Sequence, residues 1–348
     1  DDYCAHGQEV FPAWHRAYLV EFETALRKAD RSNGGDGAIA LPYWDWVASP
    51  ELPRVLQEQL AELPRGMFKE DPDANSARSQ LAGLGLGGRH STRRIAANLR
   101  ASGLPGQVDS CMMVPEHWLH ASTRWGRGSS LESPHNSVHV ALGWPMTSVA
   151  VAAFDPAFWL HHCNVDRIYE GYLQVEPDSA DEFRAVQERL SAERGEPNRF
   201  MQPLEPFKHP TSGLPFMPGD CFTTEPLGYR YDVLPHRPPP RMSVAPSLCL
   251  FMGIDALALQ RKSYMVYVFV LPSVAAAEEW APPGDDPEAW LAAPTFAGAA
   301  AVFGGKGSEC GNCQTRPPYN VFVDVTEALA KAGVTRFEAE VRVAVVDE

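Results

Sequence analysis

The chain has 348 residues, of which 45% are hydrophobic and 21% charged, an ordinary composition for a globular protein. This length favours one large domain with a second, smaller one. The formal net charge of −14 and the lack of an apolar run of membrane-spanning length argue against nucleic acids and membranes as partners, so we expect a small neutral substrate. The seven cysteines do not indicate a cellular compartment.

Two long helices are predicted from their start signals and apolar spacing. The first covers "VFPAWHRAYLVEFETALRKAD", has Pro12 in its first turn and ends before "NGGDG", which places His15 on a helix. The second begins near Asp155, an N-cap residue followed by proline and a long amphipathic run. Between them, His135 and His139 in "SPHNSVHVALG" are four residues apart, so both rings lie on one helical face.

The remaining segments predict an insertion, a linker and a β domain. Residues from about 65 to 130 are rich in Gly, Arg and Ser, and we expect them to be irregular. From about 197 to 240 the chain is rich in proline, which predicts a stiff linker and a domain boundary near 235–242. Beyond it, "SYMVYVFVLPS", "YNVFVDVTEAL" and "RFEAEVRVAVVDE" predict an antiparallel sandwich. We therefore divide the chain into domains of residues 1–235 and 242–348.

The histidines suggest a metal site. Neutral imidazole binds Cu, Zn, Fe and Ni, and the pair of His135 and His139 can present two nitrogens to one ion. A third ligand on the neighbouring helix would be His161 or His162, which are about 100° apart on a helix, so we expect only one to face the ion. No H-E-x-x-H motif is present at this pair, which disfavours a zinc protease, and clusters made only of histidine favour copper.

Five segments together resemble a known family. They are "CAHGQEVFPAWHRAYLVEFE", "LPYWDW", "LESPHNSVHVALG", "FDPAFWLHHCNVDR" and "LGYRYD". Their order and spacing look like those of type-3 copper proteins, the tyrosinases, catechol oxidases and molluscan hemocyanin units. The resemblance implies a mainly α catalytic domain, with an antiparallel four-helix bundle around a dicopper site. An all-β antiparallel sandwich that covers the copper pocket would follow.

The resemblance also implies a ligand set. His6 and His15 would hold the first copper, while His135, His139 and His162 would hold the second. His161 would lie behind these ligands, and this choice between neighbours rests on the family pattern alone. The family's first ligand of the first copper lies upstream of the segment that begins at Asp1, so we expect the sequence to be a fragment.

Cysteine chemistry leaves alternatives open. Cys4 and His6 form a C-x-H that resembles the thioether link of fungal tyrosinases and molluscan hemocyanins, although a free cysteine is the simpler interpretation. Cys310 and Cys313 form a single C-x-x-C. Their thiolates could bind Cu(I) and help to load the site, but a disulfide or an inert turn is at least as well supported.

Further residues match positions with family roles. Glu132 and Asn136 would hold an activating water for monophenols, or would instead be a helix cap and a surface residue. Val149 matches a gate over the copper. In "SLCLFMGIDAL", one of Leu250, Phe251 or the following methionine would enter the pocket as a placeholder, with a buried strand as the alternative.

The sequence therefore predicts an oxidoreductase of the tyrosinase or catechol oxidase type, with two copper ions as cofactor and O2 as co-substrate. It would add an ortho hydroxyl group to monophenols, oxidise o-diphenols to o-quinones, or do both, and the C-terminal domain would keep it latent. The alternatives are a hemocyanin-like reversible O2 carrier and a copper-poor structural relative.

Overall fold

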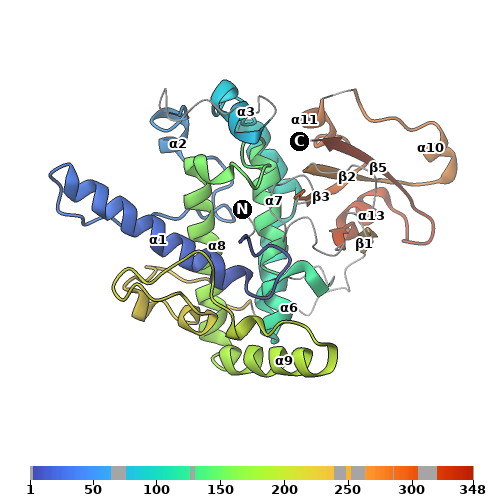
Figure 1. Cartoon of the computed structure of the whole chain (residues 1–348). Helices are drawn as coiled ribbons and strands as arrows, with labels where there is room; N and C mark the ends of the chain where they lie inside the picture. The colour runs from blue at the N-terminus through green and yellow to red at the C-terminus, as the bar shows by residue number, and fades with distance from the viewer. Residues whose placement is uncertain are drawn as a thin grey trace.

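The computed structural model describes residues 3–63, 76–125, 130–238, 248–251, 263–284, 286–304 and 320–347. Within these ranges a helical region comes first, and a smaller antiparallel β region follows it. In Figure 1 the β region lies to the right of the helices, beside α7. The predicted order, mainly helical and then β, is confirmed at this level.

The longest helices among the described residues are α1 (Phe11–Ser32), α7 (Glu132–Leu142), α8 (Pro156–Val175) and α9 (Ser179–Arg194). Both predicted long helices are present. α8 begins as expected, because the Asp155 side chain accepts a hydrogen bond from the Ala157 backbone amide and proline occupies the first turn.

Residues 77–121 are not irregular, which corrects the prediction for this part of the chain. They form four helices: α3 (Ala77–Leu84), α4 (Thr92–Ala101), α5 (Leu104–Met112) and α6 (His117–Ala121). Serine side chains cap α3 and α4, since Ser76 accepts from the amide of Ser79 and Ser91 from that of Arg94. Ile95 and Leu99 form the buried apolar face of α4, but the arginines around them make this amphipathic pattern hard to recognise in the sequence.

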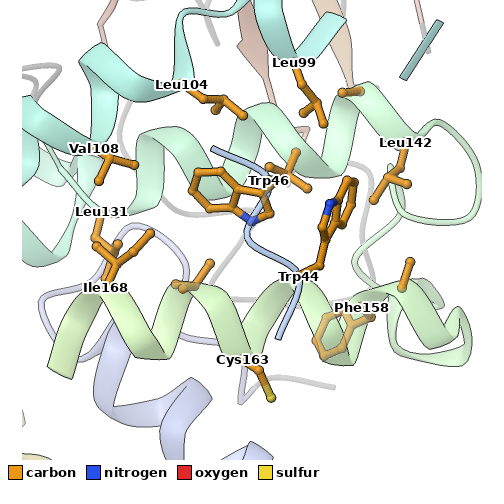
Figure 2. Packing of buried hydrophobic residues seen from close by; sticks show 14 of the residues in the cluster. Trp44, Trp46, Leu99, Leu104, Val108, Leu131, Leu142, Phe158, Cys163 and Ile168 are labelled. Atoms are coloured by element: carbon orange, nitrogen blue, oxygen red, sulfur yellow. The ribbon is translucent and has the colours of Figure 1, made fainter. Parts of the chain in front are cut away.

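The main core lies between these helices. Trp44 and Trp46, which belong to no helix, insert between α8 on one side and the α4 and α5 region on the other (Figure 2). Both side chains are almost fully buried. A short helix, α2 (Arg54–Glu58), and two 3-10 turns, η1 (Thr123–Trp125) and η2 (Ala152–Phe154), complete this region.

The proline-rich segment is not a linker over residues 199–231, because it packs against α1. It carries three 3-10 turns: η3 (Arg199–Met201), η4 (Pro218–Cys221) and η5 (Glu225–Leu227). Phe200, Leu204 and Phe216 form a second core with the apolar side chains of Ala13 and Ala17 on α1. Proline prevents regular secondary structure here, but the aromatic residues between the prolines bury enough surface to fix the segment.

Two tyrosines close the helical region. The hydroxyl groups of Tyr229 and Tyr231 donate to Oδ2 of Asp166 on α8, at 2.7 and 2.6 Å. Oδ1 of the same carboxylate accepts from Nε of Arg16 on α1 at 2.6 Å. One buried carboxylate therefore joins α1, α8 and the end of the proline-rich segment through these two tyrosines.

The β region contains two antiparallel sheets among the described residues. One pairs β1 (Leu248–Phe251) with β4 (Val321–Asp324), and the other has the order β3 (Phe296–Val302), β2 (Tyr264–Leu271), β5 (Glu340–Asp347). Three short helices lie in the described part of this region: α10 (Val274–Glu278), α11 (Pro287–Trp290) and α13 (Thr326–Ala332). Strands in all three predicted segments are confirmed, whereas β3 is too rich in alanine and glycine to read as a strand.

The small residues of β3 let the sheet approach α7. Val140 of α7 packs with Met265, Tyr267 and Phe269 on one face of β2. The Tyr267 hydroxyl donates to Oδ1 of the buried Asn98 on α4, at 3.0 Å. The β region thus shares a core with the helices. No helix among the described residues is long and apolar enough to cross a membrane.

Candidate metal centre

Six histidines from three helices and one loop gather in the helical core. They are His6 in the loop before α1, His15 on α1, His135 and His139 on α7, and His161 and His162 on α8. They form two groups in which one ligand atom per residue lies within 4.8 Å of the others: His135, His139, His161 and His162, and His6, His15 and His135. His135 belongs to both groups, so the two groups adjoin.

These imidazoles are buried, and burial disfavours the charged form of five of them. None of the six side chains is more than 5% exposed. Burial lowers the pKa of His15 to about 3 and that of His139 to about 4, because the cation would lose its hydration. The pKa values of His135, His161 and His162 also lie well below the ordinary value, for the same reason first and then because of neighbouring histidines. Each of these five rings therefore keeps a nitrogen lone pair that can bind a metal ion.

Hydrogen bonds orient three of the rings. Nδ1 of His15 donates to the carbonyl of Phe11 at 2.8 Å, and Nδ1 of His139 donates to that of Met146 at 2.7 Å. Because these acceptors require a proton on Nδ1, the lone pair lies on Nε2. Nδ1 of His135 lies 3.0 Å from Oδ1 of Asn136, which favours the same tautomer.

The donor set fits a metal ion. Nε2 of His135, Nδ1 of His162 and both ring nitrogens of His161 are buried without a hydrogen-bond partner among the described residues. Buried polar atoms are normally paired, so several orphaned nitrogens in one place indicate a missing ligand. Both groups consist only of histidine, and neutral imidazole without carboxylates suits copper or zinc.

Both histidines of the α8 pair lie in the cluster, whereas the helical spacing led us to expect only one. Nε2 of His162 lies 3.2 Å from Nε2 of His139, and the His162 ring stacks on that of His15 at 4.5 Å. The His161 ring stacks on His135 at 5.2 Å. The two side chains therefore contact different members of the cluster, which lets both take part from adjacent positions on α8.

The predicted cysteine–histidine contact is present. Sγ of Cys4 lies 2.5 Å from Nδ1 of His6, closer than an ordinary hydrogen bond to sulfur. The Cys4 side chain is 8% exposed, and Val149, the predicted gate residue, packs against it.

Glu132 and Asn136 make separate contacts. The buried Glu132 carboxylate accepts from the amide of Gly7 at 2.8 Å, and from the amide and hydroxyl of Thr123 at 2.8 and 2.7 Å. Asn136, besides its bond to His135, lines a cavity of about 40 Å³ with Gln107. Glu132 thus anchors the loop that carries His6, and its role in placing a water stays a prediction.

The remaining predicted site residues are less informative. The backbone of Leu250 and Phe251 pairs with β4 in β1, in accord with a strand, but their side chains lie outside the described part of the structure. Met252, Cys310 and Cys313 also lie outside the described residues.

Phe303, at the end of β3, is the residue that sequence reasoning missed. Its ring lies over His139 with centroids 4.5 Å apart and planes 28° apart. It also contacts His6 at 5.6 Å and His135 at 6.0 Å, so it touches members of both groups. Its side chain is 1% exposed. The only local signal was an aromatic residue before a Gly-Gly turn in "AAAVFGG".

Comparison with known proteins identifies the family. Residues 1–175, half of the chain, match the model of the "Common central domain of tyrosinase". The chain belongs to the tyrosinase family of type-3 copper proteins. It is 33% identical to the tyrosinase of Streptomyces antibioticus over 191 residues, which are 50% of this chain and 66% of that protein. It is 29% identical over 252 residues to hemocyanin G-type of Enteroctopus dofleini, covering 66% of this chain and 8% of the relative.

The fold agrees with this family. A tyrosinase structure from Burkholderia thailandensis superimposes with a TM-score of 0.63 at 18% sequence identity, over 99% of this chain and 84% of that one. The family includes both oxidases and oxygen carriers, and a buried histidine cluster is the feature that this chain offers for copper.

Proposed function

We propose that this protein oxidises phenols with O2, adding an ortho hydroxyl group to monophenols and converting o-diphenols to o-quinones. In this proposal its C-terminal domain keeps it latent. The position of the Phe303 ring carries the proposal. An apolar aromatic ring stacks on His139 and also contacts His6, so the space that the Phe303 ring fills beside the histidines would accept the ring of a phenol.

The histidines would hold the metal. His6 and His15 would bind one copper ion, and His135, His139 and His162 the other, with His161 beside them. The two ions would supply the site for binding and activating O2, the co-substrate. The chain itself keeps the ligand nitrogens neutral by burial and points them through the carbonyls of Phe11 and Met146.

Three features of the chain would serve a ring substrate. Cys4 lies close enough to His6 to support a thioether, which would fix this ring and remove a reactive thiol. Val149, beside Cys4, would border the entrance. Glu132 and Asn136 would hold a water that removes the phenol proton, a step for which general-base help contributes roughly 10² to 10⁴ in rate.

The burial of Phe303 supports the proposed latency. Because this ring occupies the space over His139, a phenol can enter only when the ring moves away. The ring belongs to the β region, so a displacement of that region or of its end of β3 would open the site. The four-helix bundle and the sandwich implied by the family remain part of this proposal.

A reversible O2 carrier is the second candidate. The same burial of Phe303 supports it, since a permanently covered metal centre could admit O2 but no ring. The hemocyanin similarity is consistent with this alternative.

The test uses the copper-loaded protein and its Phe303→Ala variant. We expect O2 consumption with a catechol and with a monophenol to rise in the variant. Phe296→Ala, at the other end of β3, should leave the rate unchanged, because this ring packs on Tyr267 and Phe269 and not on the histidines. Reversible O2 binding without turnover in all three proteins would establish the carrier instead.

A further inference from the structure

Ser263 lies between the helical and β regions with a side chain that is almost fully buried. Its hydroxyl donates to the carbonyl oxygen of Thr147 at 2.8 Å and accepts from the amide of Gly304 at 3.1 Å. Gly304 directly follows Phe303, and Thr147 directly follows Met146, whose carbonyl oxygen holds Nδ1 of His139. The Ser263 hydroxyl therefore connects the backbone next to Phe303 with the backbone segment that orients His139, the histidine on which Phe303 stacks.

Strand pairing explains this position. β2 and β3 are antiparallel, with Tyr264 opposite Val302 at the end of the ladder. The next residues outward are Ser263, before β2, and Phe303, after β3. The register thus brings Ser263 next to Phe303 and Gly304, although these residues are far apart in the sequence.

We infer that Ser263 is a positioning residue that holds Phe303 closed over His139, and so sets how strongly the protein excludes ring substrates. The inference rests on the proposed function, because it names a residue that regulates the same site. The hydroxyl satisfies a buried donor and a buried acceptor at once. Without it the closed arrangement would leave the Gly304 amide and the Thr147 carbonyl short of a hydrogen bond, whereas water could reach both groups once Phe303 and Gly304 move away.

The expected kinetic effect is specific. A ring that competes with the substrate for one space raises the apparent KM and leaves kcat unchanged, because the open form reacts normally. Loss of the hydroxyl should shift the closed–open equilibrium toward open by roughly 5- to 30-fold, the usual effect of one buried hydrogen bond. We therefore expect Ser263→Ala to lower the KM for a catechol by up to this factor.

Two companion variants make the test decisive. Ser102→Ala removes another buried serine hydroxyl, which in the described structure donates to the Asn98 carbonyl of the adjoining helix α4, and should not change KM. In a Phe303→Ala background, Ser263→Ala should have no further effect on KM, because the ring through which it acts is gone. An equal fall in KM in that background, or no fall in the single variant, would overturn the inference.

A copper-free measurement separates this inference from the proposed function. Hydrogen exchange of the metal-free protein should show a faster exchange of the Gly304 amide in Ser263→Ala, with exchange in the middle of β2 unchanged. Equal acceleration throughout the sheet would mean that the serine only stabilises the fold, and would refute the positioning role. Faster exchange at Gly304 without turnover in any variant would support the positioning role of Ser263 and refute the proposed phenol oxidation.

Discussion

Replacement of Glu132 by glutamine separates a structural role of this residue from a catalytic one. Its carboxylate accepts three short hydrogen bonds, one from Gly7 at Oε1 and two from Thr123 at Oε2. A glutamine can keep the oxygen on the Thr123 side only by turning its NH2 group toward the Gly7 amide, which places two donors against each other. Bonds to a charged group contribute about 1.5–3 kcal/mol each, so we expect the free energy of unfolding to fall by about 2–4 kcal/mol.

Thermal unfolding of the metal-free protein measures this effect. A loss of this size corresponds to a fall in Tm of roughly 5–12 °C for a domain of a few hundred residues. We also expect weaker copper binding, because Gly7 adjoins His6 and the loop loses its anchor. Glu188→Gln, at an exposed position of α9, should leave both quantities unchanged. An unaltered Tm with a selective loss of roughly 10² or more in monophenol turnover would refute this reasoning and assign Glu132 to proton removal.

Three further predictions concern the helical region. Asp166→Asn should lower the free energy of unfolding by about 3 kcal/mol in denaturant titrations, because the buried Arg16 then keeps Glu170 but loses its closest carboxylate. Tyr231→Phe, which removes one hydrogen bond to Asp166, should lower it by about 1 kcal/mol. Equal effects of the two variants would contradict this account. His120 lies on α6, outside both metal groups, and burial lowers its pKa to about 3. Between about pH 6.5 and 3 this histidine is therefore protonated in the unfolded chain but neutral in the folded one. The free energy of unfolding consequently falls as the pH falls from about 6.5 toward 3. His120→Phe should therefore reduce the loss of stability between pH 7.5 and 5 by about 2 kcal/mol, and an unchanged pH dependence would show that another group is responsible. If Cys4 forms a thioether with the His6 ring, O2 accepts the two hydrogen atoms that are lost. The intact mass of the polypeptide after aerobic copper loading should then be lower by two hydrogen atoms than that of the metal-free protein, and Cys4→Ser should abolish this difference. An unchanged mass would identify a free thiol.

Local signals in the sequence were sufficient for the helices that carry the ligands. Pro12 and the pair of Asp155 and Pro156 define helix starts through backbone geometry and capping, which depend on only a few neighbouring residues. The spacing of His135 and His139 places both rings on one face for the same reason. The helices of residues 77–121 were missed because their apolar residues are few and lie among arginine and glycine, and their stability comes from packing.

Contacts between distant segments could not be derived from the sequence in this way. The proline-rich segment has the composition of a linker, yet its aromatic residues find a partner surface on α1. That surface exists only after the helices have assembled. Glu132 matched a family position, but only the fold shows that its carboxylate holds the loop of His6.

The sequence by itself determined the family, the two ligand helices and the residues that can offer imidazole nitrogens. Only the tertiary structure decided that all six histidines converge, and that Phe303 covers them. The physical reason is the range of the forces involved. Helix caps and side-chain periodicity act over a few residues, whereas the contact of Phe303 with His139 depends on how the β2–β3 ladder is paired and how closely the small residues of β3 let it approach α7.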